Sequence, residues 1–140
     1  MATLNAVDAT PEQIGRFLAG HADGEPVYML NLLKFKKEAT YRDGEAVSGE
    51  MAYGRYAKAF GDMLRDLGIR GVETVFGGKA GTFLIGEGEG EWDAVAVVRY
   101  PDRKTMFSVV SSDTYRALHK HRKAGLDGQL LIACDGQGVF

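Results

Sequence analysis

The spacing of hydrophobic and polar residues changes along the chain and predicts four strands and four helices. The first strand is predicted over residues 27–35, where Val27, Met29 and Leu33 share one face and Leu30 and Leu32 share the other. Both faces are mostly apolar, so we expect both to be covered. Helices would cover one face, and a second copy of the chain would cover the other.

The remaining elements follow from helical spacing, alternation and capping residues. Thr10-Pro11 opens a short first helix, and residues 50–67 form a long one. Residues 38–49 are polar and predict a loop. Extended segments, short helices and the last strand are expected at 72–85, 92–100, 103–110, 113–124 and 129–134. Gly77 and Gly78 predict a bulge in the second extended segment, or a place where another group approaches the backbone.

This order of elements is the split β-α-β pattern of α+β, ferredoxin-like folds, with an antiparallel sheet and helices on one face. The chain has 140 residues, which suits a single domain. Within it we expect an N-terminal helical extension (1–26), a ferredoxin-like core (27–134) and a flexible tail (135–140).

Composition excludes several classes of function. The formal charge is -2, which argues against binding to nucleic acid. No apolar run approaches the roughly 20 residues that span a bilayer, and the N-terminus lacks the pattern of a secretory signal. Cys134 is the only cysteine, so the chain forms no internal disulfide and a cytoplasmic location is expected. The histidines lack metal-ligand spacing, and we expect neither a metal nor a cofactor.

The helix over 113–124 carries the most informative candidate residues. Its spacing places His119 and Arg122 near the face of Tyr115, whereas His121 should meet water. In a functional interpretation His119 is a general base or a ligand-binding group, and Arg122 binds an anion. In a structural interpretation the two are a semi-buried histidine and an arginine that extends to the surface, and we weight this one more heavily.

Asn31 is the second candidate, because it lies on an otherwise apolar face of the first strand. A buried amide without partners costs about 1–3 kcal/mol. Asn31 should therefore be hydrogen-bonded within the structure or aimed at a ligand. The structural role is the more common of the two.

Aromatic residues with polar tips form the third group: Tyr53, Tyr56, Trp92, Tyr100 and Tyr115. At these spacings most should belong to the core. Their hydroxyl and indole groups need partners when buried, so several of them together could also line a pocket for a flat, partly apolar ligand.

Several short motifs, in order, resemble the family known as domain of unknown function 1330, in the dimeric α+β barrel superfamily. They are Met29-Leu30-Asn31-Leu32, Tyr53-x-x-Tyr56, Gly77-Gly78, Trp92-Asp93, Tyr100-Pro101, and Ser112-x-x-Tyr115 followed by Arg122. The resemblance implies a homodimer whose two sheets pack face to face. It also implies a cleft between each sheet and its helices.

The resemblance does not name a reaction, because relatives in the superfamily include cofactor-free monooxygenases, isomerases and haem-degrading enzymes. We expect a protein that binds, and could transform, a small aromatic or carbonyl compound. His119 and Asn31 would be catalytic, and Arg122, Tyr53, Tyr56, Trp92 and Tyr115 would bind the substrate. The alternatives are a non-catalytic binding module and a haem-binding protein that uses Asn31, Trp92 and His119.

Overall fold

A computed structural model describes residues 6–20, 24–88 and 91–135 of the chain. It contains four helices and four strands in the predicted order. Their bounds are α1 (Pro11–Ala19), β1 (Val27–Phe35), α2 (Gly49–Asp66), β2 (Glu73–Lys79), β3 (Ala94–Tyr100), α3 (Arg103–Val110), α4 (Asp113–Gly125) and β4 (Leu126–Asp135). Of the predicted flexible tail, all but Asp135 lies outside the described residues.

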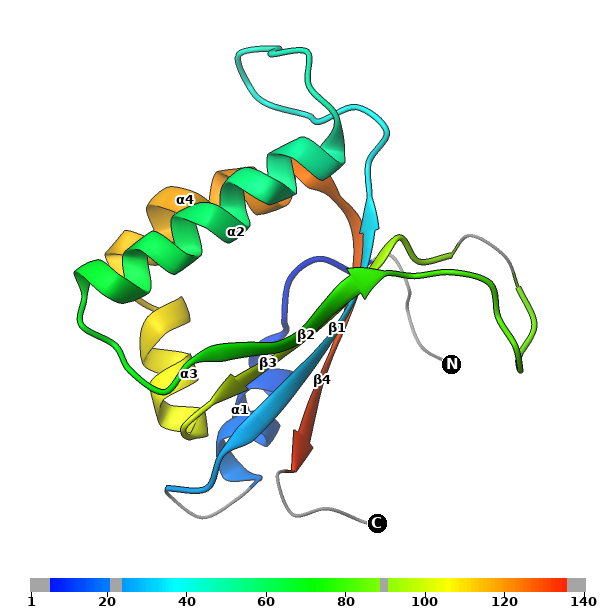
Figure 1. Cartoon of the computed structure of the whole chain (residues 1–140). Helices are drawn as coiled ribbons and strands as arrows, with labels where there is room; N and C mark the ends of the chain where they lie inside the picture. Colours follow the sequence, from blue (N-terminus) through cyan, green and yellow to red (C-terminus); the bar gives the residue numbers. More distant parts are fainter. Residues whose placement is uncertain (1–5, 21–23, 89–90, 136–140) are drawn as a thin grey trace.

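The strands form one open sheet in the order β2-β3-β1-β4, with antiparallel neighbours throughout. This is the strand order of a ferredoxin-like fold, and the helices lie on one side of the sheet (Figure 1). The α+β, ferredoxin-like prediction is confirmed. α2 and α4 lie side by side as one layer. α1 and α3 lie together near the end of the sheet where β1 begins and β3 finishes.

Capping side chains define the helix starts, and all but Ser48 were expected from the sequence. Thr10 and Gln13 form a reciprocal capping box on α1. Ser48, Asp102 and Ser112 cap α2, α3 and α4 through their side-chain oxygens. Local sequence therefore fixes where each helix begins.

The structure differs from the prediction in several details. The second extended segment ends at Lys79 rather than at residue 85, because Lys79 pairs with Ala94, the first residue of β3. The bulge lies between Thr74 and Phe76, not at Gly77-Gly78. His121 also differs from its prediction, because it is half-buried and its Nδ1 lies 2.6 Å from the hydroxyl of Tyr41 in the 38–48 loop.

The helix-facing side of the sheet has two unlike ends. At the packed end, Val27, Met29 and Tyr100 are buried. Large side chains from three helices cover them, namely Phe17, Phe60 and Met106. At the other end, which we call the open end, β1 finishes at Phe35, β2 at Lys79, and β3 begins at Ala94. All seven residues of β2 are exposed, so helices do not cover this edge of the sheet.

Candidate functional site

A tight backbone junction holds the α2 and α4 layer to the open end of the sheet. The amide of Lys36 donates to the carbonyl of Gly125 (2.7 Å), and the amide of Gly49 donates to the carbonyl of Lys36 (3.0 Å). A Cβ atom on either glycine would lie closer than 3 Å to backbone atoms of the neighbouring segment. Glycine is required at both positions by this close approach. The junction fixes the first turn of α2 above the ends of the strands.

A cavity of about 870 Å³ lies beside this junction. Its lining comes from the end of β1, the first turn of α2, the end of β2 and the start of β3. Two of the predicted binding residues, Tyr53 and Trp92, line it. A volume of this size is in the range of small-molecule sites.

Small residues form the floor of the cavity. Gly77 and Ala96 are paired in the β2–β3 register, and Ala94 follows on the same face of β3. A Cβ atom on Gly77 would meet no atom closer than 3.9 Å. The hollow therefore exists because the side chains of β2 and β3 at this end of the sheet are short, and Gly77 and Gly78 are part of its lining.

Aromatic rings form the walls. The rings of Phe35 and Tyr53 lie 5.5 Å apart, and half-buried Trp92 lies at the start of the segment that leads into β3. Burial raises the pKa of Tyr53 to about 12, while the positive charge of Arg122 acts in the opposite direction. The phenol is therefore protonated at neutral pH and can donate a hydrogen bond.

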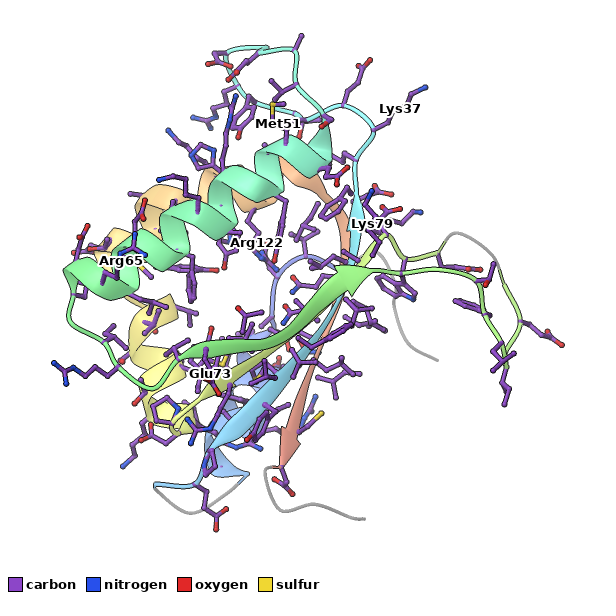
Figure 2. All side chains as sticks on the ribbon, in the orientation of Figure 1. Lys37, Met51, Arg65, Glu73, Lys79 and Arg122 are labelled. Atoms are coloured by element: carbon purple, nitrogen blue, oxygen red, sulfur yellow. The ribbon has the colours of Figure 1, made fainter. Side chains whose placement is uncertain are left out.

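Charged residues line the mouth of the cavity unequally. Lys36 is held by the hydroxyl of Thr40 and the carbonyl of Lys123, and Asp93 accepts from the amide of Phe35 at 2.7 Å. Lys37 and Lys79 lie at the open end (Figure 2). Within the described ranges neither has a carboxylate at ion-pair distance. The carboxylates of Glu50 and Asp93 also line the cavity. Against the three lysines they leave a formal excess of one positive charge, which gives an anion a modest electrostatic advantage.

A second cluster, which we call the polar network, lies between the sheet and α4. The side-chain amide of Asn31 donates to the carbonyls of Met29 (3.1 Å) and Ala96 (3.3 Å). Its oxygen accepts from the amide of Gln129 at 2.9 Å. Gln129 is only 7% exposed and its side-chain oxygen accepts from Arg122. These contacts match the structural interpretation of Asn31.

The N-terminal segment closes this network over Arg122. The guanidinium, 11% exposed, donates to the carbonyl of Val7 and lies 3.6 Å from the carboxylate of Asp8. It also points into the space between α2 and the sheet (Figure 2). An external anion would have to compete with groups of the protein itself for this side chain.

His119 belongs to the same network. Its Nε2 lies 3.3 Å from Arg122 and 3.5 Å from Asp8. Burial, and then the charge of Arg122, lowers the pKa of His119 below its usual value. A guanidinium can only donate and a carboxylate can only accept, so Nε2 can accept from Arg122 when it carries no proton and donate to Asp8 when it does. His119 does not line the cavity.

The remaining predicted tyrosines connect the two long helices. The hydroxyls of Tyr56 and Tyr115 lie 2.9 Å apart, joining α2 to α4. Burial raises the pKa of Tyr56 well above its usual range. Both rings belong to an aromatic chain that runs from Phe35 through Tyr53 to His119.

The structure thus separates the predicted site residues into two places. Tyr53 and Trp92 line the cavity, whereas Asn31, His119 and Arg122 meet in the polar network. Trp92 and His119 do not come together, so no contact favours the haem alternative. Sequence reasoning missed Gln129, Asp8 and Lys79. Of these three, only Lys79 could have been found from the sequence, because it directly follows the Gly77-Gly78 pair that the sequence already singles out.

Two features, a metal site and a membrane-spanning helix, are not found among residues 6–20, 24–88 and 91–135. No three histidine, cysteine, aspartate or glutamate side chains there gather as a set of metal ligands. No helix in these ranges is long and apolar enough to cross a membrane.

Comparison with known proteins supports the fold but gives no activity. A family model described as "Domain of unknown function (DUF1330)" matches residues 44–135. No functionally curated protein matches the sequence significantly. The crystal structure of methylated RPA0582 protein is similar, with 28% identity, a TM-score of 0.84 and coverage of 98% of each chain.

A second structure of RPA0582, described as a protein of unknown function from Rhodopseudomonas palustris, has 28% identity and a TM-score of 0.81 over 94% of this chain and 97% of that one. A dimeric protein of unknown function with a ferredoxin-like fold, from Bacteroides fragilis, has 11% identity and a TM-score of 0.52 over 79% of this chain and 95% of that one. The last likeness supports the fold.

Proposed function

The chain belongs to the family described as Domain of unknown function (DUF1330), and from that premise we propose that it binds small, flat, partly apolar carboxylates in the open-end cavity. The observation that carries the proposal is the pairing of aromatic walls with two exposed lysines at one mouth. Phe35, Tyr53 and Trp92 can hold a flat ring, and Lys79 or Lys37 can hold its carboxylate.

Tyr53 is suited to orient the ligand. Its phenol is protonated at neutral pH because burial raises its pKa to about 12. A protonated phenol can donate to a carbonyl or carboxylate oxygen of the bound molecule. This contact would set the direction in which the ring enters.

Binding is the part of the predicted function that the geometry supports best. The isomerase or monooxygenase chemistry expected from the sequence would require His119 to reach the bound molecule, and His119 does not line the cavity. Its role as a general base, and that of Asn31, stay predictions. If neither residue is catalytic, the protein binds its ligand without transforming it, which is the alternative that the sequence left open.

Trp92 is the only tryptophan in the chain, so its fluorescence reports on the cavity directly. We propose titrations with benzoate and trans-cinnamate, with the neutral amides of both as controls. We expect saturable quenching by the acids, with Kd in roughly the millimolar range for ligands of this size. The amides should bind more weakly. Equal quenching by acids and amides would contradict a site for anions.

Lys79→Met tests the charge at the mouth. We expect it to weaken benzoate binding about fivefold, since an exposed charge pair contributes about 1 kcal/mol. Lys58→Met, on the exposed side of α2 where Lys58 pairs with Asp62, is the matched control. It should leave the affinity unchanged. Equal affinities in all three proteins would overturn the role of Lys79.

We also propose that the protein is a homodimer, as expected from the sequence. The support is the outer face of the sheet, which carries Leu30 and Leu32 from β1 beside Val95 and Val97 from β3. No helix among the described residues covers this face (Figure 1). An apolar sheet face of this kind is normally packed against another layer. The single-domain organisation and the cytoplasmic location also stay predictions.

A further inference from the structure

A long arm leaves the open end of the sheet between β2 and β3. Its described part, residues 80–88, contains neither helix nor strand. The arm extends away from the helices, on the side of the bare outer face (Figure 1). At its tip Leu84 is 96% exposed and Ile85 is 93% exposed, and Phe83 precedes them. Three large apolar residues in a row at a projecting tip need a surface to cover them.

The bare face has a defined apolar pattern. Cross-strand partners share a face, so Leu30 lies between Val97 on β3 and Ile132 on β4. Phe76 lies opposite Val97 on the same face and is 58% exposed. The outer face and the arm therefore both present exposed apolar residues on the side of the sheet without helices.

The area of the outer face and the arm together fits a second copy of the chain. Four strands, taken over the seven residues of the shorter two, present a flat area of roughly 450 Å². A stable interface needs about 800 Å² on each partner. Leu84 and Ile85 each offer roughly 100 Å². When both copies give and receive an arm, the area rises to about the required value.

The outer face also meets the requirement for packing against the same face of a second copy. A two-fold dimer requires the same patch on both subunits. The centre of the outer face is aliphatic, and its charged residues, Lys34, Arg99 and Glu73, lie toward the strand ends, so the central part can pack against its own copy. A projecting arm on the same side can lie alongside the second molecule only if that molecule occupies the bare face.

We propose that residues 80–88 form an exchanged arm that grips a second copy of this chain and buries Leu84 and Ile85 against it. This inference rests on the proposed homodimer and assigns the element that completes it. The base of the arm, Gly78 to Gly81, lines the cavity, so the partner also fixes one side of the cavity mouth.

The double variant Leu84→Asp with Ile85→Asp tests the arm. Sedimentation equilibrium of the wild-type chain should give twice the 15.2 kDa monomer mass. The double variant should dissociate at least about 100-fold more readily, since two buried anchors on each subunit are lost. Its far-UV circular dichroism should be unchanged, because neither side chain contacts the core.

Met51→Asp is the matched control, because Met51 is 55% exposed but lies on α2, away from the bare face (Figure 2). It should remain a dimer. A monomeric wild-type chain would overturn both the dimer and the arm. A double variant that dimerises as tightly as the wild type would overturn the arm alone and leave the proposed homodimer standing. Neither result depends on whether benzoate binds.

Discussion

The two ends of the helix-facing side of the sheet are made from the same strands but are built differently. At the packed end, Val27, Met29 and Tyr100 meet large side chains from three helices. At the open end, Gly77, Ala94 and Ala96 leave a cavity of about 870 Å³. The short side chains of β2 and β3 at the open end therefore leave room for a binding site, whereas the large side chains at the packed end supply stability.

Met29→Ala should have the largest effect on stability. Removing a buried methionine side chain from the packed end should lower the free energy of unfolding by about 2–5 kcal/mol. Urea denaturation measures the change. The folded fraction should still bind benzoate, because Met29 does not line the cavity. Lost binding in fully folded protein would show that the two ends are not separate.

Asn31→Ala should have the next largest effect. It leaves the buried amide of Gln129 without its acceptor, which costs about 1–3 kcal/mol. Denaturation should show this loss, while the quenching of Trp92 by benzoate keeps its midpoint. A wild-type stability combined with lost binding would instead make Asn31 a ligand-binding residue.

Gly77→Leu should have the reverse effect. The new side chain has room, because a Cβ atom at Gly77 meets nothing closer than 3.9 Å, and it would fill the floor of the cavity. We expect stability to change by less than about 1 kcal/mol and affinity for benzoate to fall at least about tenfold, or 1.4 kcal/mol. Unchanged affinity would place the ligand elsewhere.

The smallest expected effect is on pH dependence. Burial lowers the pKa of His119 in the folded state, so the unfolded chain binds its proton first as pH falls. Stability from this group is present above about pH 6.5 and is lost as pH falls below it. His119→Gln should therefore show a shallower loss of stability than the wild type below pH 6.5. At pH 8 the imidazole is neutral in both the folded and the unfolded state. The free energy of unfolding of each protein at pH 8 is therefore the reference from which its loss at lower pH is measured.

Much of the fold could be predicted because it depends on local pattern. Alternation along β1 identified both of its faces, and Thr10, Asp102 and Ser112 marked three of the helix starts. The end of β2 could not be predicted, because it depends on the register with β3.

The site was predicted only in part for a similar reason. Tyr53 and Trp92 were identified because aromatic residues with polar tips are informative wherever they occur. The partnership of Asn31 with Gln129 depends on the pairing of β1 with β4, and that of Arg122 with Asp8 depends on the path of the N-terminal segment. Neither can be read from spacing along one element.

The location of the bound ligand can be measured directly by following backbone and side-chain amide signals in ¹H–¹⁵N spectra during a titration with benzoate. We predict that the largest shifts will fall on Gly77, Gly78, Ala94 and the indole of Trp92. The side-chain amides of Asn31 and Gln129 should change little. The opposite result, with shifts at those amides and none at Gly77, would place the ligand in the polar network and contradict the assignment of the open end as the binding site.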